Sequence, residues 1–270
     1  MATTDISFTG SIPQTYERLL VPLIFEHYAR DLAERLARLA PREVLETAAG
    51  TGALTREIAS RLPASARIVA TDLNQPMLDH AAAQLGQDAR ITWRQADALR
   101  LPFADHCFDA VACQFGVMFF PDRIAGYREA RRVVKPGGCL LFNVWDDIVM
   151  NEFADVVTKT LATLFPDNPP DFMARVPHGY HDANTIRQEL TAAGFGSISV
   201  EPLDGVSRAS SPRDAAIAYC QGTPLRNEIE ARDKSRLEEA TQKSADALAR
   251  RFGNGPIEGR IRALVIAAIP

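Results

Sequence analysis

The chain has 270 residues, of which 46% are hydrophobic and 24% are charged, and its formal net charge is −4. These values are typical of a folded globular protein and argue against global disorder or a disulfide scaffold. The acidic balance argues against a nucleic-acid partner, because such proteins usually carry a basic excess. The apolar runs fall far short of the roughly 20 residues that span a bilayer, and the N-terminus lacks the features of a secretory signal. We therefore expect a cytoplasmic protein without a membrane partner.

The four cysteines are Cys107, Cys113, Cys139 and Cys220. No pair of them has the C-x-x-C spacing of a zinc site, and no histidine cluster lies nearby in the sequence. The adjacent carboxylates Asp146 and Asp147 have no third acidic residue to match them. We expect reduced, buried thiols and no metal.

The N-terminal residues 13–39 carry leucine and isoleucine at helical spacing. Pro22 predicts a division of this stretch into two shorter helices, because proline lacks a donor and clashes with the preceding turn. Aromatic residues on these helices are Tyr16, Phe25 and Tyr28.

Between residues 41 and 146, short apolar runs alternate with amphipathic stretches. The predicted strands are Val44–Ala48, Arg67–Thr71, Ile91–Gln95, Phe108–Cys113 and Cys139–Trp145, and the predicted helices are Leu54–Leu62, Gln75–Leu85 and Arg123–Val134. Pro136-Gly137-Gly138 predicts a turn before the last of these strands. The alternation indicates an α/β fold with a doubly wound, mostly parallel sheet that is covered on both faces.

The pattern beyond residue 146 is less regular. The predicted elements are helices Asn151–Phe165 and Asn184–Ala193, a loop Pro166–His181, strand Ile198–Leu203, a mostly helical Pro212–Phe252 and strand Arg262–Ile269. We therefore expect a helical lid segment over residues 1–40 and a ligand-binding core over residues 41–146. The rest of the sheet would come from residues 147–270, with lid insertions near 150–181 and 207–258.

The first predicted strand runs into a glycine turn that opens a helix. Gly50 and Gly52 have no Cβ, so a ligand can lie against the main chain, and the helix N-terminus presents free N–H groups. Asp72 ends the second strand, where a carboxylate can accept hydrogen bonds from both hydroxyls of a ribose. Thr55 stands where a dinucleotide fingerprint needs a third glycine or an alanine. Glu46 adds negative charge, which suits a ligand with a positive pole better than it suits a pyrophosphate.

Each of these residues also has a purely structural interpretation. The glycines would serve a plain strand-to-helix turn, and Glu46 would cap main-chain N–H groups. Asp72 would cap the following helix, unless Asn74 serves as that cap.

Five segments, taken in order and at their spacing, resemble the motifs of the class I S-adenosylmethionine-dependent methyltransferases, in their small-molecule branch. The segments are Glu46-x-Ala48-x-Gly50-Thr51-Gly52, Asp72–Leu78, Gln95–Phe103, Phe108–Gly116 and Glu129–Gly138. The resemblance covers roughly residues 40–145. Ala48 departs from it, because it occupies the first glycine position of the family's first motif.

The resemblance implies a seven-stranded Rossmann-like sheet with helical lid elements, and S-adenosylmethionine as the cofactor. It implies that Asp72 holds the ribose, that Leu73 and Met77 pack near the adenine, and that Asp97 and the main chain of Ala98 bind the adenine edge. The full set of expected cofactor residues is Tyr16, Glu46, Ala48, Gly50, Gly52, Asp72, Leu73, Met77, Asp97, Ala98 and Gln114.

The implied reaction is an in-line methyl transfer to an O, N, C or S atom of a small metabolite. The residues expected to line the acceptor pocket are Phe25, Trp145, His178, Tyr180 and His181. His178 or His181 could accept a proton from a neutral nucleophile, but the sequence assigns no catalytic residue. A non-catalytic module that binds S-adenosylmethionine or S-adenosylhomocysteine and a nicotinamide-dependent oxidoreductase remain alternatives, and we expect a monomer or a homodimer.

Overall fold

The computed structural model describes Asp5 and residues 12–270, which form two compact units. The sheet unit consists of His27–Val144, Tyr180–Leu203 and Ala263–Pro270. The helical unit consists of the described residues up to Glu26, together with Trp145–Gly179 and Asp204–Arg262. No helix in the described part of the chain is both long and apolar enough to cross a membrane.

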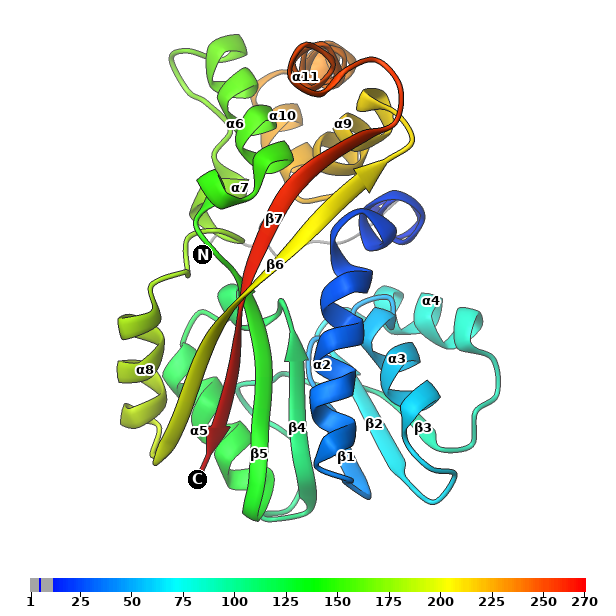
Figure 1. Ribbon diagram of the computed structural model, residues 1–270, viewed down its shortest axis with the longest axis vertical. Helices are drawn as coiled ribbons and strands as arrows, with labels where there is room; N and C mark the ends of the chain where they lie inside the picture. The colour runs from blue at the N-terminus through cyan, green and yellow to red at the C-terminus, as the bar shows by residue number, and fades with distance from the viewer. Residues whose placement is uncertain (1–4, 6–11) are drawn as a thin grey trace. The chain divides into compact units, whose positions relative to one another are not determined.

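The strands form one seven-stranded sheet in the order β3-β2-β1-β4-β5-β7-β6 (Figure 1). Their bounds are β1 Glu43–Glu46, β2 Arg67–Asp72, β3 Ile91–Gln95, β4 Phe108–Gln114, β5 Val134–Trp145, β6 Ser197–Ala209 and β7 Ile257–Ile269. Strands β1 to β5 pair in parallel, with Leu45 opposite Val69 on one side and Val111 on the other. The strand order reverses between β1 and β4, where open α/β sheets bind ligands. The predicted doubly wound, mostly parallel sheet is confirmed.

Helices α2 (Glu26–Arg38) and α3 (Ala53–Arg61) bury their apolar sides in the core of the sheet unit. Leu32 of α2 and Ile58 of α3 are fully buried in one cluster with Val44 of β1 and the small Ala110 of β4. Burying one such leucine or isoleucine contributes about 1.5–3 kcal/mol to folding. The other helices that belong to this unit are α4 Gln75–Leu85, α5 Arg123–Val133 and α8 Ala183–Ala192.

The N-terminal helix is not divided at Pro22, so this prediction was wrong. Ile12–Thr15 is α-helical (α1), Tyr16–Phe25 is a π-helical segment (η2), and α2 follows directly. The N–H of Glu26 donates to the carbonyl of Val21, five residues earlier. The wider π turn accommodates the proline ring, which would clash in an α-helix.

Pro136-Gly137-Gly138 also differs from its prediction, because it lies inside a strand. Strand β5 already begins at Val134, and its pairing with β4 is interrupted at Asp109 by an irregularity in register. A Cβ on Gly138 would lie 2.5 Å from the carbonyl oxygen of Asp109. The segment is therefore a bulge that only a glycine permits at this close approach.

Besides α1 and η2, the helical unit contains the helices between β5 and Gly179 and those between β6 and β7 (Figure 1). Their bounds are η4 Ile148–Met150, α6 Glu152–Leu164, α7 Phe172–Arg175, α9 Pro212–Gln221, α10 Leu225–Asp233, η5 Lys234–Arg236 and α11 Leu237–Phe252. Helix α7 lies within Pro166–His181, which was predicted to be a loop throughout, so this part of the prediction was wrong. The ring of Phe153 on α6 packs edge-on against Phe252 at 5.0 Å. Strands β6 and β7 are also longer than predicted.

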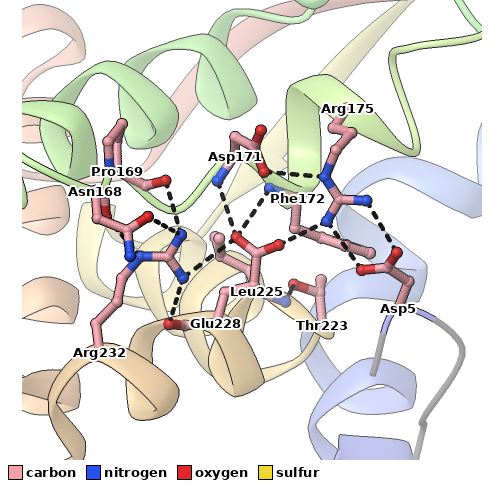
Figure 2. A network of polar contacts seen from close by, with 10 residues as sticks. All are labelled: Asp5, Asn168, Pro169, Asp171, Phe172, Arg175, Thr223, Leu225, Glu228 and Arg232. Atoms are coloured by element: carbon pink, nitrogen blue, oxygen red, sulfur yellow. Dashed lines mark hydrogen bonds and ion pairs between the residues drawn. The ribbon is translucent and has the colours of Figure 1, made fainter. Parts of the chain in front are cut away.

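Arg175, the last residue of α7, is the centre of a polar network in the helical unit (Figure 2). Its guanidinium donates to both carboxylate oxygens of Asp5, at 2.9 and 3.0 Å, and to Glu228 at 2.7 Å. Glu228 also accepts the N–H of Asp171 at 2.9 Å. Asp5 is only 1% exposed, so the ion pair with Arg175 compensates part of the cost of burying its charge.

Candidate functional site

The loop that follows β1 is fixed by hydrogen bonds to both neighbouring strands. The N–H of Thr47 donates to the carbonyl of Ala112 on β4, and the N–H of Ala49 donates to the carbonyl of Thr71 on β2, both at 2.9 Å. The loop therefore continues the sheet for two residues beyond β1 before the chain turns.

Three residues with positive φ turn the chain from β1 into α3. The φ angles are 54° at Ala48, 57° at Gly50 and 83° at Gly52. Alanine is strained in this left-handed region, whereas glycine adopts it readily. A Cβ on Gly52 would also lie 2.9 Å from Leu85, while one on Gly50 would meet only Met77, at 3.8 Å. Gly52 is thus required for packing as well as for the turn.

Asp72, at the end of β2, is bonded to the same loop. Its Oδ2 accepts the N–H of Gly50 at 2.9 Å, and its Oδ1 accepts the N–H of Asn74 at 2.8 Å. Asn74 stands at the N-cap of α4 but makes no side-chain cap, so this expectation was wrong. Burial raises the pKa of Asp72 from its ordinary value, and the N–H bonds oppose that rise.

Glu46, the last residue of β1, is a buried carboxyl group. It is 1% exposed, and its Oε2 accepts the hydroxyl of Thr55 at 2.7 Å. Burial raises the pKa of Glu46 to about 8, opposed by this hydrogen bond and reinforced by the charge of Asp72. Thr55 thus occupies the position where a dinucleotide fingerprint has glycine or alanine. Here its hydroxyl binds the carboxyl group of Glu46. Two acidic groups beside a main-chain loop favour a ligand that carries positive charge.

The ends of β2 and β3 carry the residues expected near an adenine. Leu73 is 48% exposed, whereas Met77 on α4 is buried. The Oδ1 of Asp97 accepts the N–H of Leu99 at 2.9 Å, and Asp97 is exposed while Ala98 is half-buried. A base edge can therefore reach the Asp97 carboxylate from solvent.

Two buried polar side chains, one in β5 and one in the turn after β1, were not among the predicted site residues. Asn143 of β5 is opposite Gln114 of β4 and is fully buried. Its Oδ1 accepts the N–H of Phe115 at 3.0 Å, but its Nδ2 has no hydrogen-bond partner among the described residues. The hydroxyl of buried Thr51 likewise has none in the described part of the chain. Asn143 could have been found from the sequence, because it interrupts the apolar run Leu140–Trp145 and a buried amide needs hydrogen-bond partners.

Comparison with known proteins identifies the class to which this geometry belongs. Residues 44–138 match a family model described as a methyltransferase domain. The demethylmenaquinone methyltransferase of Corynebacterium kroppenstedtii is 31% identical over 192 residues, which is 65% of this chain and 80% of that protein. The enzyme of the same name from Corynebacterium urealyticum is 33% identical over 186 residues, or 65% and 77% of the two chains. The chain belongs to the class I S-adenosylmethionine-dependent methyltransferases.

The fold of this methyltransferase agrees with solved structures. The YcgJ protein of Bacillus subtilis has a TM-score of 0.57 at 18% identity, over 90% of this chain and 98% of that one. The chain is therefore an enzyme that transfers a methyl group from S-adenosylmethionine to a small metabolite. This decides against the two alternatives that the sequence left open, a nicotinamide-dependent oxidoreductase and a non-catalytic binding module.

The residues of the methyltransferase's sheet unit fit that cofactor. Glu46 and Asp72 are acidic groups that suit a cation and a ribose. The unpartnered hydroxyl of Thr51 and the unpartnered amide of Asn143 are buried polar groups that a bound ligand can satisfy. Gly50 leaves the main chain open beside Met77.

Four of the predicted side chains lie together in the helical unit. The ring of Tyr16 stacks on Phe25 at 5.1 Å, Phe25 lies 5.9 Å from Trp145, and Trp145 lies 5.9 Å from the imidazole of His178. The Nδ1 of His178 is 2.9 Å from the carbonyl oxygen of Asp146. We call Tyr16, Phe25, Trp145 and His178 the aromatic cluster.

Tyr180 and His181 belong to the sheet unit instead. The Tyr180 hydroxyl donates to Glu189 at 2.6 Å and is 3.1 Å from the hydroxyl of Tyr127, and Arg123 lies over its ring at 4.1 Å. Burial raises the pKa of Tyr180, and the bond to Glu189 raises it further. These contacts join the segment before α8 to α5.

Tyr28, expected in the lid with Tyr16 and Phe25, lies in the core of the sheet unit. It is fully buried, and its hydroxyl donates to the carbonyl of Leu203 at 3.3 Å. Its ring meets Phe115 edge-on at 5.5 Å. Tyr28 therefore supports the turn after β4 and does not cover a ligand.

Proposed function

We propose that this methyltransferase acts on a small acceptor with a planar aromatic body, of the quinol type. The aromatic cluster carries the proposal, because stacked and tilted rings favour a flat apolar ligand. The relatives named demethylmenaquinone methyltransferase support the same class of acceptor.

The cofactor is proposed to lie along the carboxyl ends of β1 to β4. Asp97 and Ala98 bind the adenine edge, with Leu73 and Met77 beside the ring, and Asp72 accepts hydrogen bonds from the ribose. The main chain from Ala48 to Gly52 and the carboxyl of Glu46 hold the methionine end, together with Gln114. The raised pKa values of Asp72 and Glu46 support this assignment, because a cationic ligand compensates buried carboxylates.

The cofactor, when bound, supplies an activated methyl group and a neutral thioether leaving group. The protein's task is to align the acceptor atom with that methyl group and to exclude water, and alignment alone can contribute about 7–11 kcal/mol. Within the aromatic cluster, the rings of Tyr16 and Trp145 suit a flat acceptor. Phe25 supports both rings through its contacts.

His178 is proposed to take up the proton that a phenolic acceptor loses. A carbonyl oxygen can only accept, so the neighbouring Nδ1 of His178 carries a proton and donates it to Asp146. The basic nitrogen of the neutral ring is then Nε2. A phenolate is a stronger nucleophile than the phenol, at oxygen and at the adjacent ring carbons.

Methyl-group transfer tests the acceptor class directly. Purified enzyme is incubated with methyl-labelled S-adenosylmethionine and either 1,4-naphthoquinol, a catechol, an aliphatic amine or an aliphatic carboxylate. We expect label in the aromatic compounds, and transfer to the aliphatic acceptors alone would refute the proposal. We also propose a cytoplasmic location, which the four free thiols support. We further propose a monomer or a homodimer. Sedimentation of the purified protein measures its oligomeric state.

A further inference from the structure

The alanine at position 48 is matched by a glycine at the end of another strand. Gly116 follows β4, and a Cβ on it would lie well inside 3.0 Å of the Ala48 Cβ and 2.7 Å from the Sγ of Cys113. The φ of Gly116 is −102°, which any residue can adopt. Space, and not backbone conformation, therefore requires the glycine.

The turn that carries Gly116 cannot retreat easily from Ala48. Phe115 is held at a positive φ of 49°. Its N–H donates both to the side chain of Asn143, at 3.0 Å, and to the main-chain carbonyl of the same residue, at 3.2 Å. The main chain of Gly116 is also hydrogen-bonded to the thiol of Cys113. Strain of this kind persists only where surrounding contacts fix it.

Ala48 is equally constrained on its own side. Its neighbours Thr47 and Ala49 are bonded to β4 and β2 respectively, at 2.9 Å. Its methyl group is bonded directly to Cα, so no side-chain rotation can move it away while the main chain is fixed. Two fixed backbones thus meet at one methyl group.

We propose that Ala48 and Gly116 are a matched pair of positioning residues. The Ala48 methyl occupies the space that Gly116 leaves, and this contact sets the course of the main chain from Ala48 to Gly50, where the N–H of Gly50 meets Asp72. The pair explains how this chain tolerates alanine where the family's first motif has glycine. The inference rests on the proposed cofactor site.

The test is a double-mutant cycle read out as the Kd for S-adenosylmethionine, measured by calorimetry. Gly116→Ala should weaken binding by at least about tenfold, because the new methyl group displaces the loop. Ala48→Gly alone is the second arm of the cycle and measures the effect of the methyl group when residue 116 is glycine. Ala48→Gly combined with Gly116→Ala should recover most of the lost affinity. A residual loss in the double variant would reflect the Cys113 contact. Gly196→Ala is the matched control, since no atom lies within 4 Å of its Cβ position.

If Gly116→Ala weakened binding through a general loss of stability, removing the Ala48 methyl group would not restore the affinity. Thermal unfolding without cofactor is measured on every variant, and Ala48→Ser provides a milder enlargement of the same contact if Gly116→Ala does not fold. Ala48→Ser should also weaken cofactor binding, but by less than Gly116→Ala does. The control Gly196→Ala should leave the Kd unchanged. The proposed pairing is overturned if Gly116→Ala and Ala48→Ser both bind the cofactor like the wild type. It is also overturned if Ala48→Gly does not recover the affinity lost in Gly116→Ala. Wild-type protein that fails to bind the cofactor overturns the proposed site as well.

Discussion

The carboxylate of Asp72 accepts the main-chain N–H of Gly50 at 2.9 Å, which ties the end of β2 to the glycine turn after β1. One side chain therefore shapes the loop and, in the proposed site, also binds the ribose. Its second oxygen is held by the N–H of Asn74, so the carboxylate orientation is fixed before any ligand arrives. Preorganisation of this kind lowers the cost of binding.

Asp72→Ala should weaken S-adenosylmethionine binding at least about tenfold, equivalent to about 1.4 kcal/mol. The variant loses both the ribose acceptor and the bond that fixes Gly50. Calorimetric titration measures the change. Asp79→Ala on the exposed face of α4 is the control and should bind like the wild type; equal affinity in Asp72→Ala would remove this residue from the site.

Glu46 should make cofactor binding depend on pH. Its pKa is raised to about 8, so at neutral pH the carboxyl holds a proton that a cationic ligand must displace. Affinity should therefore rise by up to about tenfold per pH unit below pH 8 and level off above it. Glu46→Gln should abolish this slope, while Glu57→Gln should keep it. A wild-type Kd that is constant from pH 6 to pH 8 would contradict the role of Glu46.

The Glu46 carboxyl should stabilise the ligand-free protein at low pH, whereas it should favour cofactor binding at high pH. Its folded-state pKa lies above the ordinary value of 4.5, so the folded state binds this proton more tightly than the unfolded state. The contribution is fully present below pH 4.5 and is lost as the pH rises through about 8. Compared with the wild type, Glu46→Gln should lose less stability between pH 5 and pH 8, as measured by denaturant unfolding.

His178→Ala should lower kcat by about 10²-fold to 10⁴-fold with a phenolic acceptor, because the proposed base is missing. The Kd for S-adenosylmethionine should not change, since the proposed cofactor residues lie elsewhere. His181→Ala is the comparison variant and should retain most of the activity. Initial rates over pH 6–9 measure both effects, and a His178→Ala enzyme with wild-type kcat would refute the assignment.

Arg175→Ala should destabilise the protein by about 3 kcal/mol, because it removes the guanidinium that is paired with the buried carboxylate of Asp5. Combining it with Asp5→Asn should recover part of the loss. Arg208→Ala removes an exposed ion pair with Glu258 and should change stability by less than about 1 kcal/mol. Urea unfolding of the four proteins measures the differences; equal effects of Arg175→Ala and Arg208→Ala would show that the buried network adds nothing.

The sequence predicted the elements of the sheet unit well, because each of them is encoded locally. Gln75–Leu85 and Ile91–Gln95 have the predicted bounds, and the turn from β1 into α3 has the positive φ angles that its glycines suggested. Pro22 was misread, since a π-helical segment can accommodate a proline that an α-helix cannot. Strands β6 and β7 were predicted too short, because residues 204–209 and 257–261 mix polar with apolar residues and do not form apolar runs.

Some contacts were invisible in the sequence because they join segments that are distant along the chain. Spacing and turn chemistry predicted that an acidic strand end, a glycine turn and a second carboxylate would form one ligand site, and the hydrogen bond from Gly50 to Asp72 joins the turn to the second carboxylate. Only the folded chain decided that Gly116 makes room for Ala48, that Asn143 holds Phe115, and that Tyr28 is a core residue. Periodicity reports which face of an element is buried, but close packing in three dimensions selects the partner that each buried atom meets.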